Sequence, residues 1–186
     1  MVQLPAQFNV TTYFIDRNVR EGRGGKVAIE CGDQRVTYAQ LLERTNRLGN
    51  ALRKLGVQHE ERVQLILLDT PEFLYGFFGA IKIGAVAVPT NTLLKPDDYR
   101  YLLNDTRARI AIVSQPLLAM LQAIPRSELP HLETIVVTGC STEDCLDFED
   151  LLDAASPQLD PAPTGKDDPA FWLYSSGSTG PPKGCV

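Results

Sequence analysis

One stretch near the end of the chain gathers the residue types that bind phosphate. It reads Tyr174-Ser175-Ser176-Gly177-Ser178-Thr179-Gly180-Pro181-Pro182-Lys183-Gly184. Glycine has no Cβ and adopts positive φ easily, so successive backbone N–H groups can turn inward and surround an anion. Hydroxyls add donors, and Lys183 adds a charge worth about 1 kcal/mol in water, or about 4 kcal/mol at a lower effective dielectric, per nearby phosphate charge. The stretch predicts a polyphosphate site made by Ser175, Ser176, Gly177, Ser178, Thr179, Gly180 and Lys183.

The spacing differs from that of the common P-loop, in which a lysine directly follows a glycine and precedes a hydroxyl residue. Lys183 instead follows a proline and precedes a glycine. A flexible Ser/Gly linker is the alternative interpretation, but two prolines stiffen the exit and an apolar run at 170–173, expected to be a buried strand, leads in. Ser176 and Ser178 lack the G-x-S-x-G spacing of hydrolase nucleophiles, so hydrogen bonding to phosphate is their better role.

The same stretch resembles the phosphate loop of the adenylate-forming enzymes, which include acyl-CoA synthetases, luciferases and peptide-synthetase adenylation domains. That loop has an aromatic residue, a hydroxyl residue and then approximately Ser-Gly-Ser/Thr-Thr-Gly-x-Pro-Lys-Gly, and residues 174–184 match it throughout. The resemblance implies that residues 175–183 close over the β- and γ-phosphates of ATP while a carboxylate attacks the α-phosphate. It also implies Mg²⁺ and coenzyme A as requirements of the complete enzyme.

The resemblance extends over essentially the whole chain. Residues 8–20, 67–73, 91–94 and 170–174 look most like benzoate-CoA ligases and 4-hydroxybenzoate-CoA ligases. Two further motifs resemble core motifs of the family, and we interpret both as structural. One describes a capped helix, and the other has small residues that let helix and strand backbones approach closely. They are Val36-Thr37-Tyr38 with Leu41, and Ile81-Lys82-Ile83 with Gly84-Ala85-Val86-Ala87-Val88-Pro89.

The implied activity is that of a ligase that activates a carboxylic acid, benzoate or a related aromatic acid, with ATP to an acyl-adenylate and transfers the acyl group to CoA. In the family, the acyl pocket, the residues around adenine and Mg²⁺ and the catalytic lysine follow the phosphate loop, so no catalytic residue is assigned in this chain. We expect an N-terminal fragment that is inactive alone and can self-associate through uncovered apolar surface. The alternatives are a stand-alone nucleotide- or phosphate-binding module without catalysis and a structural α/β interaction domain.

The composition limits the class of protein. The 186 residues are 44% hydrophobic and 22% charged, with a net charge of −5, which suits a globular protein with small-molecule partners and argues against nucleic-acid binding. The four cysteines lack zinc or thioredoxin spacing, so we expect free thiols in the cytoplasm and no protein metal site. The N-terminus lacks signal-peptide features, and the most apolar segment, 73–89, is too interrupted to span a membrane.

Hydrophobic periodicity predicts alternating strands and helices. Helices are expected at 9–19, starting from an Asn cap, and at 38–55, 71–83, 95–104, 116–124 and 148–155, and strands at 26–31, 35–37, 62–68, 84–89, 109–113 and 134–137. This alternation predicts an α/β fold with a mostly parallel sheet and helices on both faces. The resemblance adds that this is the N-terminal part of an acyl-CoA synthetase-like large domain.

The division of the chain follows from the position of its prolines and of the phosphate motif. We expect an α/β subdomain over 1–155, a Pro-rich connector over 156–169, and over 170–186 a strand with the phosphate-binding loop, truncated before the rest of the large domain and the C-terminal domain. The acidic segment 143–147 is interpreted as a solvated loop, because it lacks the pattern of a calcium-binding loop. His59 and His131 have no partner in sequence and are expected at the surface or in packing.

Overall fold

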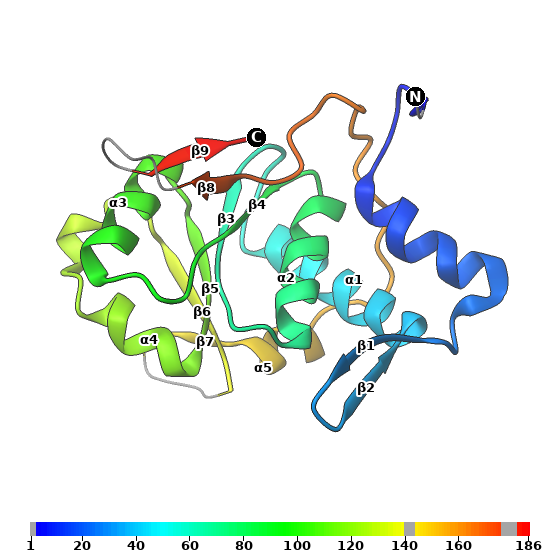
Figure 1. Ribbon diagram of the computed structural model, residues 1–186, viewed down its shortest axis with the longest axis horizontal. Coiled ribbons are helices and arrows are strands. Elements are labelled where there is room, and N and C mark those ends of the chain that lie inside the picture. Colours follow the sequence, from blue (N-terminus) through cyan, green and yellow to red (C-terminus); the bar gives the residue numbers. More distant parts are fainter. Residues whose placement is uncertain (1–2, 140–143, 176–181) are drawn as a thin grey trace.

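A parallel five-stranded sheet forms the centre of the molecule (Figure 1). The computed structural model describes residues 3–139, 144–175 and 182–186. The sheet has the order β4-β3-β5-β6-β7, and each neighbouring pair is parallel. The predicted α/β fold with a mostly parallel sheet is confirmed. The strands are β3 Arg62–Ile66, β4 Val86–Pro89, β5 Ile110–Ser114, β6 Thr134–Thr138 and β7 Leu146–Asp147.

Helices cover both faces of this sheet, as crossovers between parallel strands require. One face carries α1 Tyr38–Lys54, α2 Pro71–Lys82 and α5 Phe148–Asp153, and the other carries α3 Pro96–Thr106 and α4 Gln115–Gln122. Successive strand residues serve opposite faces, so the isoleucines of β5 join the core of the first group and Ala111 and Val113 join that of the second. Each helix that the structure describes is too short or too polar to cross a membrane.

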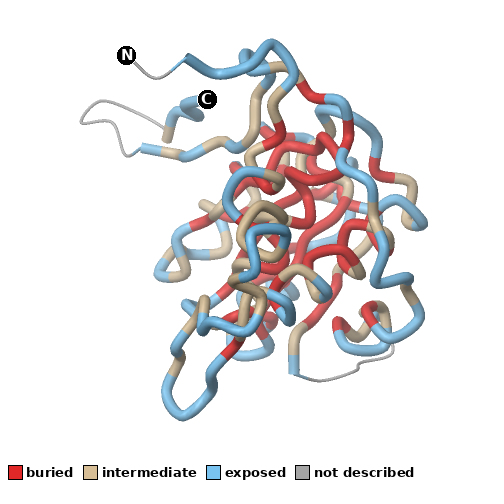
Figure 2. The backbone as a smooth tube through the Cα atoms, turned by 90° about the vertical axis from the view of Figure 1, so that its right-hand side faces the viewer, coloured by how far each residue is buried: buried red, intermediate tan, exposed pale blue. Residues whose placement is uncertain are grey.

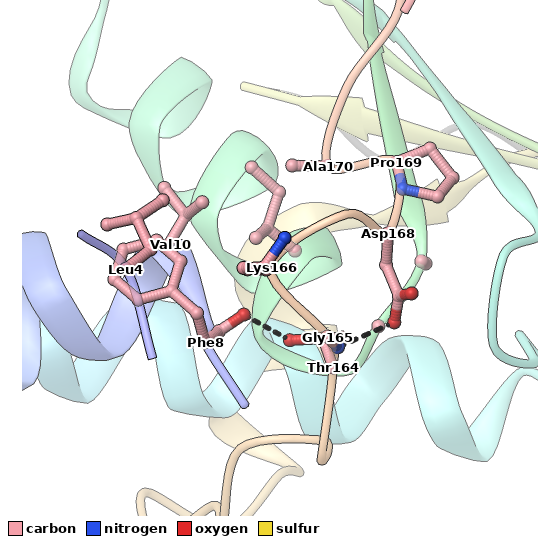
Figure 3. Close-up of a pocket in the computed structure, with 12 residues that line it drawn as sticks. Leu4, Phe8, Val10, Thr164, Gly165, Lys166, Asp168, Pro169 and Ala170 are labelled. Atoms are coloured by element: carbon pink, nitrogen blue, oxygen red, sulfur yellow. Dashed lines mark hydrogen bonds between the residues drawn. The ribbon is translucent and has the colours of Figure 1, made fainter. Parts of the chain in front are cut away.

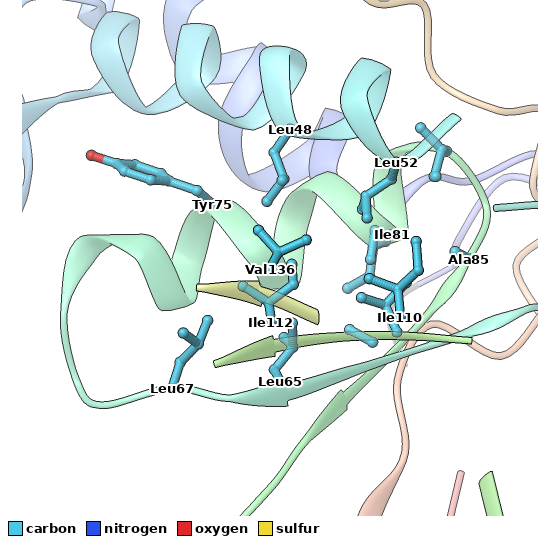
Figure 4. Packing of buried hydrophobic residues seen from close by; sticks show 14 of the residues in the cluster. Leu48, Leu52, Leu65, Leu67, Tyr75, Ile81, Ala85, Ile110, Ile112 and Val136 are labelled. Carbon is cyan, nitrogen blue, oxygen red and sulfur yellow. The ribbon is translucent and has the colours of Figure 1, made fainter. Parts of the chain in front are cut away.

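The larger apolar core fills the space between the sheet and α1 and α2. Figure 4 shows Leu52 of α1 and Ile81 of α2 directed toward Leu65 and Ile112 of the sheet. α2 is apolar on nearly all sides and lies between α1 and the sheet, because a helix without a polar face is stable only when both of its sides are covered. Figure 2 shows the buried residues running through the centre of the molecule. The helices and strands therefore form a rigid support for the segments at its ends.

Several elements begin where the sequence predicts. Thr37 caps α1, because its side chain accepts a hydrogen bond from the backbone N–H of Gln40, and the Gln40 side chain accepts one from the Thr37 N–H at 2.9 Å. This reciprocal arrangement is a capping box. The strands predicted at 26–31 and 35–37 form an antiparallel hairpin of β1 Val27–Cys31 and β2 Gln34–Thr37. Gly32 at its turn has a φ of 57°, which glycine adopts without strain.

Three local features of the structure go beyond the predictions. The N-terminal helix contains two π-helical turns, Thr12–Asp16 and Val19–Arg23, and its helical backbone breaks at Glu21 and Gly22, close to the predicted end at residue 19. A short 3-10 helix at Arg126–Glu128 was not predicted. The described part of the acidic segment contains strand β7, and Asp147 accepts hydrogen bonds from two N–H groups at the start of α5. A short carboxylate side chain is a good helix cap, so this part of the segment is not a simple solvated loop.

The Pro-rich segment 156–169 lies against α1. Asn46 donates a hydrogen bond to the Pro157 carbonyl at 2.8 Å, and Asn50 donates to the carbonyls of Ser156 and Gln158, both at 2.8 Å. Backbone groups that belong to no helix or strand thus find side-chain partners on the helix. The polar face of α1 fixes the path by which the chain reaches the predicted phosphate loop.

Candidate functional site

A short antiparallel hairpin carries the two ends of the predicted phosphate loop. Its strands are β8 Leu173–Ser175 and β9 Lys183–Cys185. Ser175 lies opposite Lys183, so the hairpin register brings a hydroxyl and a cation to the same end, and both residues are exposed. The remaining predicted ligands lie outside the described residues; they are Ser176, Gly177, Ser178, Thr179 and Gly180.

The tyrosine that begins the motif packs across this hairpin. Tyr174 lies opposite Gly184, and a Cβ on Gly184 would lie 3.4 to 3.5 Å from the nearest Tyr174 side-chain atoms. The Tyr174 hydroxyl donates a hydrogen bond to Oδ2 of Asp105 in α3 at 2.6 Å. Burial raises the pKa of the Tyr174 hydroxyl, and its hydrogen bond to the Asp105 carboxylate raises this pKa further. The hydroxyl therefore stays protonated near neutral pH and remains a donor.

The other side of the hairpin is also bonded to α3. The Tyr101 hydroxyl donates a hydrogen bond to the backbone carbonyl of Pro182 at 3.1 Å. Tyr101 and Asp105 are four residues apart and share one face of the helix. α3 therefore contacts β8 through Asp105 and the residue before β9 through Tyr101, and Figure 1 shows the hairpin beside this helix.

The segment leading into β8 runs along the outer edge of the parallel sheet. The Trp172 N–H donates a hydrogen bond to the Ala87 carbonyl of β4 at 2.9 Å, and Phe171 forms a parallel bridge with Ala87. Phe171 and Leu173 are 39% and 49% exposed, so the prediction of a buried strand here was wrong. An edge segment has a sheet neighbour on one side only. The hairpin then lies near the carboxyl end of β4, at the edge where ligands bind in open α/β sheets.

A cavity of about 400 Å³ lies under the hairpin. Its walls include Pro89 and Thr90 at the end of β4, and Tyr174 and Pro182 of the hairpin segment. The Thr90 hydroxyl is hydrogen-bonded to the buried side chain of Gln64. Because the Thr90 hydroxyl is already paired, we assign no ligand to it, and the cavity provides space beneath the hairpin.

A second, smaller cavity of about 180 Å³ lies between the N-terminal segment and the Pro-rich segment (Figure 3). Figure 3 shows the apolar side chains of Leu4 and Phe8 on one side of it. The Thr164 hydroxyl donates a hydrogen bond to the Phe8 carbonyl at 2.9 Å, and the Gly165 N–H donates to Oδ2 of Asp168 at 2.7 Å. These polar groups bind one another, so the cavity is a packing space and we assign no ligand to it.

The other described residues that could bind a metal or react lie away from the hairpin or have no second reactive group beside them. In the part of the chain that the structure describes, no group of three or more His, Cys, Asp or Glu could hold a metal ion. The described cysteines, Cys31, Cys145 and Cys185, are free thiols. His59 is half-exposed, with Nε2 at 3.8 Å from Oδ2 of Asp168. None of these groups competes with the hairpin as a candidate site.

Tyr101 and Asp105 were not predicted as site residues from the sequence. The predicted helix ended at residue 104, one position before Asp105. Their partners on the hairpin are 81 and 69 positions away along the chain. The one available signal was their spacing of four, which places two residues on the same helix face but does not say what that face contacts.

Comparison with known sequences gives the family. A family model described as AMP-binding enzyme matches residues 15–186. The benzoate-CoA ligase of Thauera aromatica is 45% identical over 186 residues, which are 100% of this chain and 35% of that protein. The 4-hydroxybenzoate-CoA/benzoate-CoA ligase of Rhodopseudomonas palustris is 42% identical over 179 residues, covering 96% of this chain and 33% of that protein.

Solved structures agree with the sequence relatives. An anthranilate CoA ligase in complex with anthranoyl-AMP superposes with a TM-score of 0.93 and 42% identity, covering 97% of this chain and 35% of that one. A benzoate CoA ligase from Burkholderia xenovorans gives a TM-score of 0.82 and 40% identity, and the match covers 95% of this chain and 34% of that one. The chain spans about a third of the length of the relatives it matches. Because the family model matches nearly all of it, the chain belongs to the AMP-binding enzyme family, whose acid-CoA ligases it resembles over their N-terminal part.

Proposed function

We propose that this chain is the N-terminal, ATP-phosphate-binding part of an aryl-CoA ligase that uses benzoate or a related aromatic acid. In the first half-reaction the acid carboxylate attacks the α-phosphate of ATP, the acyl-adenylate forms and pyrophosphate leaves. In the second, the thiol of CoA attacks the acyl carbon and AMP leaves. The observation that carries the proposal is the pairing of Ser175 with Lys183 at the loop end of a hairpin whose sequence matches the family's phosphate motif.

The proposed role of the hairpin is electrostatic. Negative charge builds on pyrophosphate as it leaves, and positioned N–H, hydroxyl and ammonium groups stabilise that charge. The Ser175 hydroxyl and the Lys183 ammonium can both stabilise this charge, together with the loop that connects them. Mg²⁺ would neutralise part of the phosphate charge. It is held mainly by phosphate oxygens, water and one or two carboxylates, so it does not require a cluster of protein ligands in this chain.

The choice of an aromatic acid rests on the relatives. Benzoate, 4-hydroxybenzoate and anthranilate are named for proteins that are 40 to 45% identical to this chain. More distant relatives include an acetyl-coenzyme A synthetase of Bacillus subtilis at 32% identity. The higher identity supports an aromatic acid over a short aliphatic one. The proposal places the protein in the cytoplasm, with ATP, CoA and a small acid as its partners.

The assignment of Lys183 can be tested in the full-length protein by measuring benzoate-dependent pyrophosphate release. Lys183→Ala should weaken ATP binding or adenylation about tenfold or more, because one ammonium beside a phosphate is worth about 1–4 kcal/mol. The matched control is Lys166→Ala, since the Lys166 ammonium pairs with Asp167 at 2.6 Å outside the hairpin. If Lys183→Ala releases pyrophosphate at the rate of the unchanged protein, the phosphate-site proposal is wrong.

A separate measurement tests the division of labour along the chain. Residues 1–186 alone should form no benzoyl-CoA when benzoate, MgATP and CoA are supplied, because the proposal assigns acid activation to residues outside this chain. Thioester formed by residues 1–186 would show that this assignment is wrong, while leaving the role of the hairpin open to the Lys183 test.

A further inference from the structure

The hairpin that carries the phosphate motif is held by one face of one helix. Asp105 accepts a hydrogen bond from the Tyr174 hydroxyl at 2.6 Å, and Tyr101 donates one to the Pro182 carbonyl at 3.1 Å. Tyr174 directly precedes Ser175, and Pro182 directly precedes Lys183. The two hydrogen bonds therefore hold both strands of the hairpin directly beside Ser175 and Lys183, the pair from which the loop extends.

The hairpin has little else to fix its position. Each of its strands has three residues, and an isolated two-stranded hairpin is marginally stable in water. The cavity of about 400 Å³ separates it from the end of β4, so packing beneath it is incomplete. The segment before β8 is bonded to the sheet edge at Ala87, and beyond that point the hydrogen bonds from α3 are a large part of what locates Ser175 and Lys183.

We propose that Tyr101 and Asp105 are positioning residues of the ATP-phosphate site, acting on the β- and γ-phosphates through Tyr174 and Pro182. This inference rests on the proposed function of the hairpin. Neither residue contacts the nucleotide. They set the place of Ser175 and Lys183, and a site that binds phosphates by several converging donors loses affinity when the donors are displaced.

The inference predicts a specific pattern of binding. ATP carries the two phosphates that the hairpin would hold, whereas AMP lacks both. Tyr101 and Asp105, through their hydrogen bonds to the hairpin, are the two anchors of the site. Loss of either anchor should therefore weaken binding of ATP and leave binding of AMP unchanged. A merely structural role for α3 would weaken both nucleotides together, because it would disturb the whole domain.

The experiment is calorimetric titration of the full-length protein with ATP and with AMP, without any carboxylic acid, so that no adenylate forms. Tyr101→Phe and Asp105→Ala should each raise the dissociation constant of ATP about threefold to tenfold, the effect expected for one lost hydrogen bond. Asp105→Asn keeps an acceptor for the Tyr174 hydroxyl and should restore most of the affinity. The AMP dissociation constant should stay the same in all three.

The chain offers a matched control on the same helix. The Tyr99 hydroxyl donates to the Asn91 carbonyl at 3.2 Å, so Tyr99→Phe also removes one tyrosine–carbonyl hydrogen bond of α3 but none to the hairpin. Its ratio of ATP to AMP affinity should equal that of the unchanged protein. Thermal unfolding of every variant checks the fold, and Tyr101→Phe removes a single oxygen atom and carries the test if Asp105→Ala does not fold.

The outcomes separate this inference from the proposed function. Equal weakening of ATP and AMP, or no weakening in Tyr101→Phe and Asp105→Ala, overturns the role of the anchors. If Lys183→Ala weakens ATP binding selectively while the anchor variants do not, the phosphate site stands and the positioning role fails. If the unchanged protein binds ATP no better than AMP and Lys183→Ala changes neither, the proposed function itself fails and the inference falls with it.

Discussion

At the scale of single residues, the lysine of the second core motif forms a buried ion pair with the N-terminal helix. The Lys82 side chain is 2% exposed, and its Nζ lies 2.8 Å from Oδ1 of Asp16, whose side chain is 16% exposed. The motif was predicted to be structural, and the space at Gly84 is taken by His59 and Ala162, whose side chains would meet a Cβ there. The lysine itself ties the N-terminal helical segment to α2 through one charged contact.

Asp16→Ala should destabilise the protein by about 3–5 kcal/mol, because it leaves a buried ammonium without its carboxylate partner. Urea unfolding of residues 1–186 measures this change. The matched control is Glu30→Ala, which breaks the ion pair between Glu30 and Arg35. The side chains of these two residues are 66% and 73% exposed, respectively. Exposed pairs contribute at most about 1 kcal/mol. Equal effects of the two substitutions would contradict the importance of the buried pair.

The candidate site could be predicted only in part from the sequence. The residue types and spacing of the motif predict that Ser175 and Lys183 bind phosphate, because glycine, hydroxyl and lysine together are typical of such a site. That the two face each other, and that Tyr174 is held by Asp105, depends on contacts between segments far apart in the chain. Spacing along a sequence carries no information about such contacts.

At the scale of elements, α1 and α2 cross at two glycines. A Cβ on Gly79 would lie 3.2 Å from the Thr45 carbonyl oxygen and 3.3 Å from the Gly49 nitrogen. These are backbone atoms and cannot move aside as a flexible side chain would. The close crossing explains why an apolar helix such as α2 contains glycines, although glycine lowers helix propensity by about 1 kcal/mol relative to alanine.

Gly79→Ala should destabilise the protein, because overpacking of a helix crossing costs about 1–3 kcal/mol and exceeds the gain of up to about 1 kcal/mol in helix propensity. The midpoint of urea unfolding measures the net effect. Gly25→Ala is the control, since nothing lies within 4 Å of a Cβ at that exposed position, and its effect should stay within about 0.5 kcal/mol. A Gly79→Ala protein as stable as the control would mean that the crossing can relax.

Most elements were predictable because their signals are local. The capping box at Thr37 and the proline at the start of α2 mark helix starts, and the continuous apolar run of β5 marks a strand buried on both faces. The errors have a common cause in tertiary contacts. Residues 170–173 are as apolar as a core strand, yet they lie at the sheet edge, where Phe171 forms a bridge with Ala87 and Leu173 pairs with Cys185 of β9. The path of the Pro-rich segment depends on side chains of α1, which local patterns do not reveal.

At the scale of the whole molecule, apolar side chains remain exposed where the hairpin meets the sheet edge. Phe171, Leu173 and Val186 are 39%, 49% and 82% exposed. In the described part of the chain, β9 pairs with β8 alone. An open strand edge beside apolar side chains favours pairing with another chain. Figure 2 shows that the buried core does not extend to the C-terminal end of the chain.

We therefore expect residues 1–186 to self-associate as concentration rises, with light scattering reporting an increase in average mass. Leu173→Glu should shift the protein toward monomer, because a carboxylate at an interface must lose its hydration. Leu93→Glu is the matched control, since Leu93 is 88% exposed and lies outside both strands of the hairpin. A mass that stays monomeric at every concentration, or that falls equally in both variants, would show that this edge does not drive association.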